Sequence, residues 1–372
     1  MASVTKADVL QAAHEVGIDL VGFAGAAPLA EDRGRMEEAL SGGRVPLEGE
    51  RRTRDLAAFC DPSSVLQGAA SVVCAAQSYL KDEPDDLSKP GEPHGLIAAY
   101  TRRNHYKDLK DRLKALAGLL GLAPAKCSSC GPLAEKPLAR RSGLGWYGKH
   151  GIIITKPLGS WVVLGELVTG VEFEPDPEVP DSCGDCRACV QACPTGAITG
   201  PGRLDRSKCF QHLTNSSSAM PLAWRDLWAK RLYGCVTCQQ VCPKNQGLKP
   251  LSRSVEKGVV GPSIPVSPLL SMSEAEYRER FKGNQVAARW VRFESIRRNA
   301  CLALGNSGDP AAAQALEQAL AHDPAALVRG HAAWSLGKLS GPAAKPALER
   351  ARASEPDREA RSELESALAR LR

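Results

Sequence analysis

The N-terminal half of the chain alternates helix-like and strand-like patterns of apolar residues. MASVTKADVLQAAHEVGIDLVGFAG predicts an amphipathic helix that runs into a short strand, LVGFAG. The apolar runs SVVCAAQSYL, GIIITK and SWVVLGELVTG predict further strands, and KDLKDRLKALAGLLG has the apolar spacing of a helix. Strands interleaved with helices indicate a layered α/β domain over residues 1–175.

Two proline-rich stretches interrupt this pattern and predict the domain boundaries. EFEPDPEVPD, which is also acidic, indicates a linker at the end of the first domain. GLKPLSRSVEKGVVGPSIPVSPL indicates a second linker. A ferredoxin-like domain is therefore expected at 176–250 and a helical domain at 272–372, and 372 residues suffice for two to three domains.

The C-terminal segment repeats a pattern that is rich in alanine and leucine. IRRNACLALGNSGDPAAAQALEQAL is followed by VRGHAAWSLGKLSGPAAKPALERA and then by DREARSELESALARL. Arg297 and Arg329 are thirty-two residues apart, and Arg358 follows twenty-nine residues later. This period predicts a short HEAT-like solenoid of helix pairs, and a generic helical bundle is the alternative.

Eight cysteines between Cys183 and Cys242 form the most informative motif of the chain. The first run is CGDCRACVQACP and the second is CVTCQQVCP, with one cysteine alone between them. Thiolates at two-residue intervals converge on one iron–sulfur cube, whereas the cysteine that precedes proline ligates the other cube. Crossing these ligands predicts two [4Fe–4S] sites. The first takes Cys183, Cys186, Cys189 and Cys242, and the second takes Cys193, Cys209, Cys235 and Cys238.

Zinc and disulfides are the competing explanations of these cysteines. Zinc favours paired C-x2-C knuckles and does not need the C-x3-C-P extension. Disulfide frameworks belong to small secreted domains, and the first residues of this chain lack the apolar segment of a secretory signal. Thiolate-ligated clusters indicate a reducing cytoplasm. Three cysteines on apolar segments are expected to be packed core thiols: Cys60, Cys74 and Cys301.

Composition and charge narrow the function classes without identifying one. A hydrophobic content of 43% is ordinary for a globular protein, and no apolar run approaches the ~18 residues of a membrane helix. The net charge of +6 would favour a polyanionic partner. Two clusters indicate electron transfer, and the larger remainder of the chain must house an acceptor. No G-x-G-x-x-G motif opens the first domain, so a nicotinamide or flavin site of that type is not supported.

The stretch from residue 143 to residue 170, GLGWYGKHGIIITKPLGSWVVLGELVTG, is the most unusual part of the first domain. Backbone without side chains can approach a large flat ligand closely. From the spacing alone, a turn-rich hairpin is the better explanation of these glycines. The glycines concerned are Gly143, Gly145, Gly148 and Gly151.

Several motifs together resemble the epoxyqueuosine reductase family. EKPLARRSGLGWYGKHGIIITKPLGSWVVLGEL is similar to the core motif of that family. CGDCRACVQACPTGAI, CFQHLT and YGCVTCQQVCPKN resemble its double-cluster domain, and RRNACLALGN resembles the start of its HEAT-like domain. The resemblance covers nearly the whole chain, and it is the combination of motifs, not the cluster spacing, that is specific.

The resemblance implies a cobalamin, bound base-off between the α/β domain and the clusters. Electrons from an external low-potential donor would pass through both clusters to the cobalt. The reduced cofactor would then remove the epoxide oxygen of epoxyqueuosine in tRNA and give queuosine. Low-potential clusters beside a corrin suit this chemistry. The implied oxidoreductase would be a cytoplasmic monomer without membrane contact, with the anticodon stem-loop of tRNA as its partner.

Cofactor contacts carried over from the family fall on the glycine-rich segment and on the loop expected to face it. These residues are Gly145, Gly148, Lys149, His150, Ser129 and Cys130. Weaker correspondences are Arg52, Gln211, Thr214 and Ser216. The basic helical tail would suit the docking of RNA phosphates. The candidates there are Arg297 and Arg298, followed by Arg289, Arg292 and Arg329, although a solvated helix face explains each single arginine more simply.

The chain departs from the family pattern where substrate chemistry is expected. The family carries Asp-Ser/Thr-x-Pro before the EKPLA segment, with the aspartate as general acid. Here CSSCGP places Ser129 at that position, and a serine of ordinary pKa is a poor proton donor. HYK at 105–107 stands where the family reads Asp-Tyr-His, and Val236 and Lys244 replace a common aspartate and tryptophan.

These departures leave three functions open. In the first, another group supplies the proton, and the candidates are Tyr147, Lys149, His105 and Glu135. In the second, the chain is a paralogue that reduces a different substrate, in the manner of reductive dehalogenases. In the third, it passes electrons to a corrinoid on another protein. The pair Cys127 and Cys130 fits a redox dithiol, a ligand near cobalt or two unpaired thiols.

Overall fold

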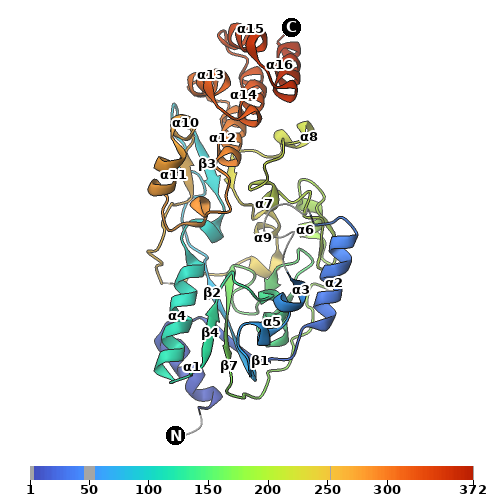
Figure 1. The fold of residues 1–372 in the computed structure, drawn as a ribbon, viewed down its shortest axis with the longest axis vertical. Coiled ribbons are helices and arrows are strands. Elements are labelled where there is room, and N and C mark those ends of the chain that lie inside the picture. The colour runs from blue at the N-terminus through green and yellow to red at the C-terminus, as the bar shows by residue number, and fades with distance from the viewer. Residues whose placement is uncertain (1–3, 46–54, 252, 372) are drawn as a thin grey trace. The chain divides into compact units, whose positions relative to one another are not determined.

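The computed structural model describes residues 4–45, 55–251 and 253–371 (Figure 1). The chain forms two compact units that interleave along the sequence. The first unit comprises Met1–Asp82, Asn104–Ser207 and Thr237–Lys257, and the second comprises Glu83–Arg103, Lys208–Val236 and Gly258–Arg372. The boundaries at 1–175, 176–250 and 272–372 stay a prediction about the sequence.

A four-stranded antiparallel sheet forms the centre of the first unit. The strand order is β1 (Leu20–Gly25), β2 (Ser71–Ser78), β7 (Val162–Thr169) and β4 (Ala125–Ser128). Each neighbouring pair is antiparallel and in continuous register, with Leu20 opposite Ala76 at one edge and Cys127 opposite Leu167 at the other. The predicted strands LVGFAG, SVVCAAQSYL and SWVVLGELVTG are confirmed, whereas GIIITK contributes only the short strand β6 (Ile153–Ile154).

Helices cover both faces of this sheet, which explains why β2 and β7 are continuous apolar runs. On one face, α4 (His105–Leu119) places Leu113 beside Gly165 of β7. On the other face, α5 (Glu135–Arg141) places Leu138 in the core (Figure 1). All eight residues of β7 are buried in consequence.

The N-terminal helix shows how local sequence sets the start of an element. The helix α1 (Lys6–Glu15) begins after Thr5, whose hydroxyl accepts a bond from the N–H of Asp8. The Asp8 carboxylate accepts the N–H of Thr5 over 2.8 Å, which completes a capping box. Val9 and Ala12 are buried one turn apart. The helix-to-strand prediction for this segment is therefore confirmed.

The other elements of the first unit are short. They are α2 (Ala30–Ser41), α3 (Leu56–Phe59), β5 (Trp146–Tyr147), α6 (Ala188–Ala192), β8 (Ile198–Gly200), β9 (Arg203–Leu204) and α9 (Thr237–Gln240). The predicted linker EFEPDPEVPD contains no helix or strand. Within the described residues, no helix is long and apolar enough to cross a membrane.

The second unit begins with a small sheet and continues into helices. Its strand order is β10 (Arg231–Tyr233), β3 (His94–Ile97) and β11 (Ser263–Pro265). β10 runs parallel to β3, and β11 runs antiparallel to it. The short helices are α7 (Phe210–Leu213), α8 (Leu222–Arg225), α10 (Ser267–Ser271) and α11 (Glu274–Arg280).

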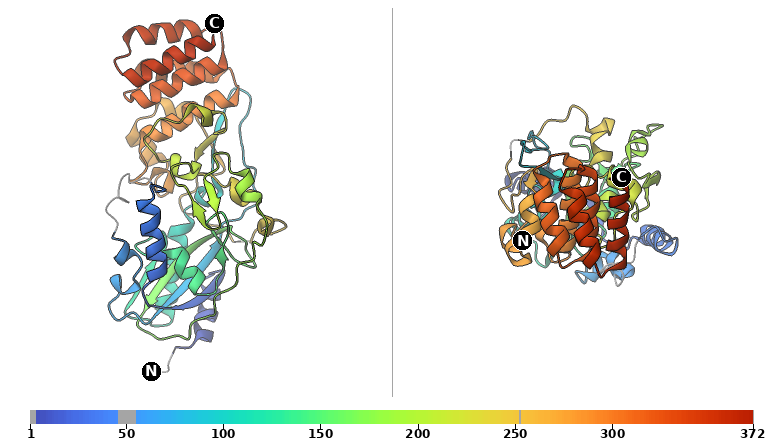
Figure 2. Two further views of the ribbon diagram at one scale, coloured as in Figure 1. Left: turned by 90° about the vertical axis from the view of Figure 1, so that its right-hand side faces the viewer. Right: turned by 90° about the horizontal axis from the view of Figure 1, so that it is seen from above.

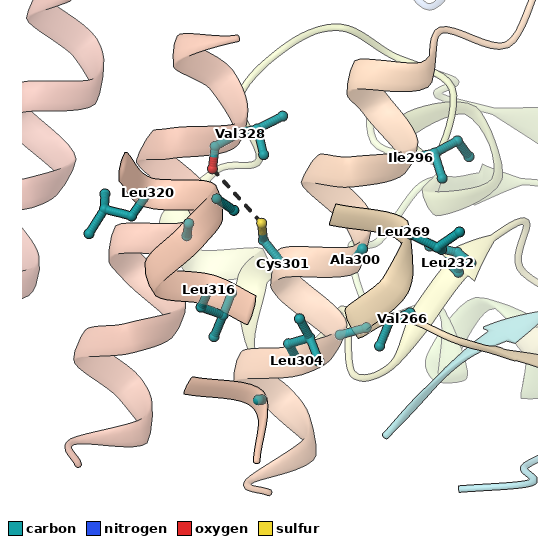
Figure 3. Packing of buried hydrophobic residues seen from close by; sticks show 14 of the residues in the cluster. Leu232, Val266, Leu269, Ile296, Ala300, Cys301, Leu304, Leu316, Leu320 and Val328 are labelled. Carbon is teal, nitrogen blue, oxygen red and sulfur yellow. Dashed lines mark hydrogen bonds between the residues drawn. The ribbon is translucent and has the colours of Figure 1, made fainter. Parts of the chain in front are cut away.

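Five longer helices form the predicted solenoid. They are α12 (Phe293–Ser307), α13 (Ala312–His322), α14 (Ala326–Leu339), α15 (Ala344–Ser354) and α16 (Arg358–Arg370), and they stack side by side (Figure 2). α12 ends at Gly308, whose φ of 68° is left-handed. The core between the first helices contains Cys301, Leu316 and Val328 (Figure 3).

The three predicted core thiols are buried. Cys301 is fully buried, and its thiol donates to the carbonyl oxygen of Val328 over 3.9 Å (Figure 3). Cys60 and Cys74 lie in the core beside the sheet of the first unit. Burial raises the pKa of the Cys74 and Cys301 thiols, so both stay protonated at neutral pH. The prediction that these cysteines are packed core thiols is confirmed.

Candidate iron–sulfur and cofactor site

The four predicted ligands of the first cluster lie together in the first unit. Cys183 and Cys186 lie on one loop, Cys189 on α6, and Cys242 after α9. Burial raises the pKa of the Cys189 thiol, and the neighbouring thiols of Cys242, Cys183 and Cys186 raise it further. Four thiols from two distant segments are thus close enough to influence one another, and their assignment to one cube stays a prediction.

Apolar side chains cover one side of this group. Trp146, from β5, and Ile154, from β6, pack against Cys242 and Cys183. Such a shell excludes water and lowers the local dielectric constant, and both effects tune the reduction potential of a cluster. The hairpin of the glycine-rich segment therefore contributes the shell of the first cluster site.

Lys149 ties the same hairpin to the cluster loop. Its ammonium group donates to the carbonyl oxygens of Gly184 over 2.5 Å and of Cys186 over 2.9 Å. These bonds hold the tight turn between Cys183 and Cys186. Lys149 was predicted as a cofactor contact and as a proton donor, and the structure assigns its ammonium to the loop backbone.

A buried amide network anchors the other cluster segment to the sheet. Asn245 donates to the Ser160 hydroxyl over 2.9 Å and to the carbonyl oxygen of Gln239 over 2.7 Å. Its side-chain oxygen accepts the Ser160 N–H over 2.8 Å. Gln239 donates in turn to the Tyr79 hydroxyl over 2.7 Å. The backbone around Cys242 is thereby fixed to the start of β7.

The ligands predicted for the second cluster are divided between the two units. Cys193 and Cys238 belong to the first unit, and Cys209 and Cys235 belong to the second. All four are partly exposed. The second cluster site thus stays a prediction from the cysteine spacing.

Packing within the protein explains two glycines of the segment from residue 143, because neither position has room for a side chain. A Cβ on Gly145 would lie 2.3 Å from the carbonyl oxygen of Ile154, and a Cβ on Gly148 would lie 2.6 Å from the His150 ring. Both glycines permit the close approach of β5 and β6. The hairpin explanation of these glycines is confirmed, whereas their predicted contact with a cofactor stays a prediction.

His150 is a buried imidazole with one unused nitrogen. Its Nδ1 accepts the N–H of Ile152 over 3.2 Å, which places the proton on Nε2. That Nε2 is buried and has no hydrogen-bond partner within the described part of the chain. Burial, followed by the nearby charge of Lys136, lowers the pKa of His150 to about 4. A neutral buried donor without a partner is a suitable contact for a bound ligand.

Ser129 and Cys130 lie on the loop between β4 and α5. The Ser129 hydroxyl donates to the carbonyl oxygen of Leu164 over 2.6 Å, so its proton points into the sheet. Cys130 is exposed and has a φ of 56°, and its N–H donates to the Glu135 carboxylate. Gly131 N–H donates to the same carboxylate over 3.3 Å. Glu135, a predicted proton donor, therefore stabilises the loop as an acceptor.

Glu166 is a buried acidic residue beside this loop, and the sequence analysis did not identify it. It lies on β7 opposite Ser128 of β4, whose hydroxyl donates to its Oε2 over 2.9 Å. It is only 1% exposed, and burial together with the nearby Glu135 raises its pKa well above the ordinary value. The sequence does contain an indication of it, because Glu166 is the one charged residue within the apolar strand VVLGELVT.

Tyr147 is a weak acid in its surroundings, and the other remaining proton-donor candidate, His105, is buried. Burial raises the pKa of the Tyr147 hydroxyl above its ordinary value. His105 is buried with its ring 6.0 Å from that of Tyr79. Burial also raises the pKa of Cys127 to about 11, so this thiol is not a reactive thiolate at neutral pH. A shared role of Cys127 and Cys130 stays a prediction.

The weaker cofactor correspondences have structural roles or lie outside the description. Arg52 lies outside the described residues. The Thr214 hydroxyl donates to the carbonyl oxygen of Gln211 over 2.9 Å and accepts the Gly234 N–H over 3.2 Å. Ser216 is buried and donates to Ser218 over 3.0 Å. The hydroxyl groups of Thr214 and Ser216 thus form hydrogen bonds within the protein, and their predicted contact with a cofactor stays a prediction.

Matches to known families cover most of the chain. Residues 60–129 match the family described as epoxyqueuosine reductase QueG, DUF1730. Residues 182–245 match the 4Fe-4S double cluster binding domain, which includes all eight predicted ligands. Residues 291–369 match HEAT repeats, which decides between the solenoid and a generic bundle.

Curated relatives extend this similarity to nearly full length. The chain is 34% identical over 337 residues to epoxyqueuosine reductase of Bacillus anthracis, covering 87% of this chain and 86% of that protein. The chain belongs to the epoxyqueuosine reductase family. The epoxyqueuosine reductase of Bacillus subtilis is 33% identical over 385 residues, covering 99% and 96% of the two chains.

Solved structures of epoxyqueuosine reductases share the whole fold. A selenomethionine-labelled epoxyqueuosine reductase superposes with a TM-score of 0.88 at 31% identity over 99% of both chains. An epoxyqueuosine reductase with an epoxyqueuosine-modified tRNA-Tyr stem loop gives 0.87 at 31% identity over 98% of both chains. The predicted fold class, an α/β region with a double-cluster domain and a HEAT-like C-terminus, is confirmed.

One solved relative bears directly on the loop at Ser129. In the Bacillus subtilis epoxyqueuosine reductase, which gives a TM-score of 0.88 at 31% identity over 99% of both chains, an aspartate lies on a catalytic loop that is swung out of the active site. In this member of the epoxyqueuosine reductase family, the motif reasoning places Ser129 at that position. The family fold is therefore retained, and the serine in place of the loop aspartate stays a prediction from the motif.

Two arginines predicted to contact RNA form hydrogen bonds or an ion pair within the protein. Arg298 is fully buried and donates to the carbonyl oxygens of Ser218 and Leu213, each over 2.6 Å. The Arg297 side chain is 13% exposed and forms an ion pair with Asp323 at 2.9 Å. The prediction that Arg298 contacts RNA is wrong for this structure, because a guanidinium group inside the core cannot reach a phosphate.

Proposed function

We propose that this member of the epoxyqueuosine reductase family reduces epoxyqueuosine in tRNA to queuosine, with two [4Fe–4S] clusters and cobalamin as the electron relay. One observation carries the proposal: full-length similarity to epoxyqueuosine reductases, with all eight predicted cluster cysteines inside the matched double-cluster domain. Removal of the epoxide oxygen as water takes two electrons and two protons. The protein must therefore deliver both to one buried place.

The residues around the hairpin fit a bound corrin. His150 offers an N–H without a partner, and the backbone beside Gly148 carries no side chain. When bound, cobalamin supplies a strongly reducing metal centre for the removal of the oxygen. Cys183 and Cys242 lie against the same hairpin through Trp146, so a cofactor held there would be close to the first cluster. Three other predicted contacts would act on the backbone around the cofactor. Gly145 permits the close approach of the hairpin strands, Lys149 binds the cluster loop, and the Cys130 N–H binds the Glu135 carboxylate.

We infer that electrons enter from an external low-potential donor and that the second cluster, at Cys193, Cys209, Cys235 and Cys238, receives them first. Clusters with thiolate ligands stay intact in a reducing compartment, which supports a cytoplasmic location. A tRNA stem loop is the partner that the similar complex suggests.

An exposed arginine–tryptophan segment of the second unit is our candidate for the RNA contact. Trp290 is 55% exposed although it is a large aromatic residue, and Arg289 and Arg292 beside it are exposed. Aromatic rings stack on unpaired bases and arginines contact phosphates. This segment replaces Arg297 and Arg298 as the proposed contact of the anticodon stem-loop.

A second candidate function has one observation in its favour. The loop that carries an aspartate in the Bacillus subtilis relative carries Ser129 here, with its hydroxyl bonded to the Leu164 carbonyl. A related cobalamin and iron–sulfur reductase with a different substrate would not need that aspartate. The two candidates share clusters and cofactor and differ only in the substrate.

A binding and turnover experiment separates these functions. Protein reconstituted without oxygen is incubated with a chemical reductant and stem-loop RNA that carries either epoxyqueuosine or guanosine. We expect about eight iron atoms per chain and queuosine only from the modified RNA. Iron and cobalamin at full content with tight RNA binding but no queuosine would favour another substrate. Full iron content without bound cobalamin would favour an electron carrier.

A further inference from the structure

We propose that Glu166 is the proton reservoir of the site and that the Ser128 hydroxyl passes its proton towards the bound substrate. The proposal rests on the proposed function, because it supplies a proton source for the same reaction. Glu166 and Ser128 are direct register partners on β7 and β4, and their side chains are 2.9 Å apart. Ser128 immediately precedes Ser129, where the family carries its acid.

The surroundings of Glu166 favour a neutral carboxylic acid. Glu166 is 1% exposed, and no ion pair involves it in the described ranges. The groups that face it are Ser128 from β4, Cys74 from β2 and Glu135 from α5. None of these is a cation. An ionised carboxylate without a cation in the core is strongly unfavourable, so the neutral form of the carboxyl group is favoured.

Within the described residues, the opposite face of β7 provides no cation that could pair with an ionised Glu166, because the neighbours found there are apolar. Gly165, the preceding residue of β7, points to the face that α4 covers with Leu109 and Leu113. Glu166 therefore points to the α5 face, where Cys74 and Leu138 belong to the apolar core. Burial and the neighbouring Glu135 both raise the pKa of Glu166 in this position.

Ser128 connects the buried acid with the loop. Glu166 is fully buried, Ser128 is half-buried, and Cys130 two residues later is exposed. A serine hydroxyl can accept one hydrogen bond and donate another at the same time. In the structure the Ser128 hydroxyl donates to Oε2 of Glu166, so it must turn to accept the acid proton and to direct its own proton to the loop. The neighbouring Ser129 is not such a link, because its hydroxyl donates to the carbonyl oxygen of Leu164, which has no proton to give.

The transfer conserves protons. As negative charge develops on the substrate oxygen, the Ser128 Oγ–H proton moves to that oxygen and the Glu166 proton moves to Ser128 Oγ. Glu166 is left as a carboxylate, and a proton from water returns through Ser128 when the product leaves. The electrons come from the reductant of the proposed function, so the relay itself carries no redox change.

Glu166→Gln and Ser128→Ala test the relay in the full-length protein. Glutamine preserves the shape of the side chain but has no acidic proton, and alanine removes the connecting hydroxyl. Cys74→Ala is the matched control, because Cys74 is the other register partner of Glu166 and has no place in the relay. We expect single-turnover rates to fall at least about 10-fold in both relay variants, as for the loss of a general acid. Substrate KM should be unchanged, and the double variant should be no slower than either single variant.

Two readouts separate this role from simple packing. The wild-type rate should fall as the pH rises through the Glu166 pKa, and Glu166→Gln should lose that dependence. Independently of activity, the infrared carbonyl band of a protonated carboxylic acid should be present in the apoprotein at pH 7, absent in Glu166→Gln and shifted in Ser128→Ala. Cys74→Ala should keep the band and the pH profile.

The outcomes also distinguish this proposal from the proposed function. If wild-type protein with full iron and cobalamin forms no queuosine, the proposed function fails, whatever the variants do. If wild-type protein forms queuosine and Glu166→Gln does so at the same rate and with the same pH profile, the relay is overturned. If Glu166→Gln does not fold, Ser128→Ala and the apoprotein band decide: an unchanged rate or an absent band in wild type contradicts the relay.

Discussion

The Lys149 ammonium group donates to the carbonyl oxygen of Cys186 over 2.9 Å, and this bond connects the glycine-rich hairpin to the first cluster loop. The same ammonium also bonds to Gly184, within the turn between two cluster ligands. The hairpin therefore acts on the cluster through a bond to the backbone and through the apolar cover of Trp146.

Lys149→Ala should release the first cluster more readily than the second. The substitution removes two charge-assisted bonds from the turn that presents Cys183 and Cys186, each worth about 1.5–3 kcal/mol. We expect loss of about four of about eight iron atoms during incubation with a chelator, measured by iron analysis over time. Lys156→Ala, at an exposed position of the same hairpin region, is the control. Equal iron retention in both variants would contradict this role.

Asn245→Ala should destabilise the first unit. The amide makes three hydrogen bonds with Ser160 and Gln239 in a buried network, and its removal takes away all three. We expect the free energy of unfolding of the apoprotein to fall by about 2–4 kcal/mol in urea titrations. Lys244→Ala, at the exposed neighbouring position, should change it little. A stability equal to that of wild type would argue against the network.

His150 should make the folded apoprotein sensitive to acid. The pKa of His150 is lowered from 6.5 to about 4 in the folded protein. Between these pH values the unfolded chain therefore binds a proton at His150, whereas the folded chain does not. Stability is therefore lost as the pH falls through this window, by up to about 3 kcal/mol. His150→Gln should flatten the fall between pH 6.5 and 4, measured by urea unfolding. A parallel fall in both proteins would be inconsistent with the lowered pKa.

Trp290→Ala should weaken RNA binding without affecting the clusters. Stacking of a base on an aromatic ring is worth about 1–3 kcal/mol, so the dissociation constant for a stem-loop RNA should rise about 5- to 160-fold. Fluorescence anisotropy measures the change. Leu222→Ala, which removes another exposed apolar side chain of the same unit, should leave the affinity unchanged. Equal affinities of the two variants would exclude Trp290 from the interface.

Ser129→Asp should make turnover independent of Glu166. The introduced carboxyl group would lie beside the Leu164 carbonyl oxygen, which repels a carboxylate and favours the protonated form. We expect Ser129→Asp to restore single-turnover rates in the Glu166→Gln background to within about 10-fold of wild type, as expected for a new general acid. No recovery, in protein with full iron content, would mean that this position no longer faces the substrate.

Local patterns carried most of what the sequence could predict. The spacing from Cys183 to Cys189 identifies cluster ligands because the chain between them is too short to point elsewhere. The repeat at Arg297 and Arg329 likewise identifies helix pairs that can bury their apolar faces only against neighbours. These predictions depend on short segments, and both match known families.

Residues whose role depends on distant neighbours were not predictable in the same way. Arg298 looks like a surface arginine, yet carbonyl groups about eighty residues earlier in the chain bind it inside the core. The hydrogen-bond partner of Glu166 could not be predicted, because it depends on the pairing of β4 with β7, which places Ser128 opposite Glu166. Lys149 and Gly148 also have local contacts that the sequence could not predict, with the cluster loop and with the His150 ring, and their contact with a cofactor stays a prediction.

The account is tested most directly by an anaerobic turnover measurement on the reconstituted protein with epoxyqueuosine-bearing stem-loop RNA. We predict that queuosine appears in stoichiometric amounts once reductant is added and that it disappears when Cys242 or Cys238 is replaced by serine. Protein that holds iron, cobalamin and RNA but leaves the epoxide intact would contradict the account.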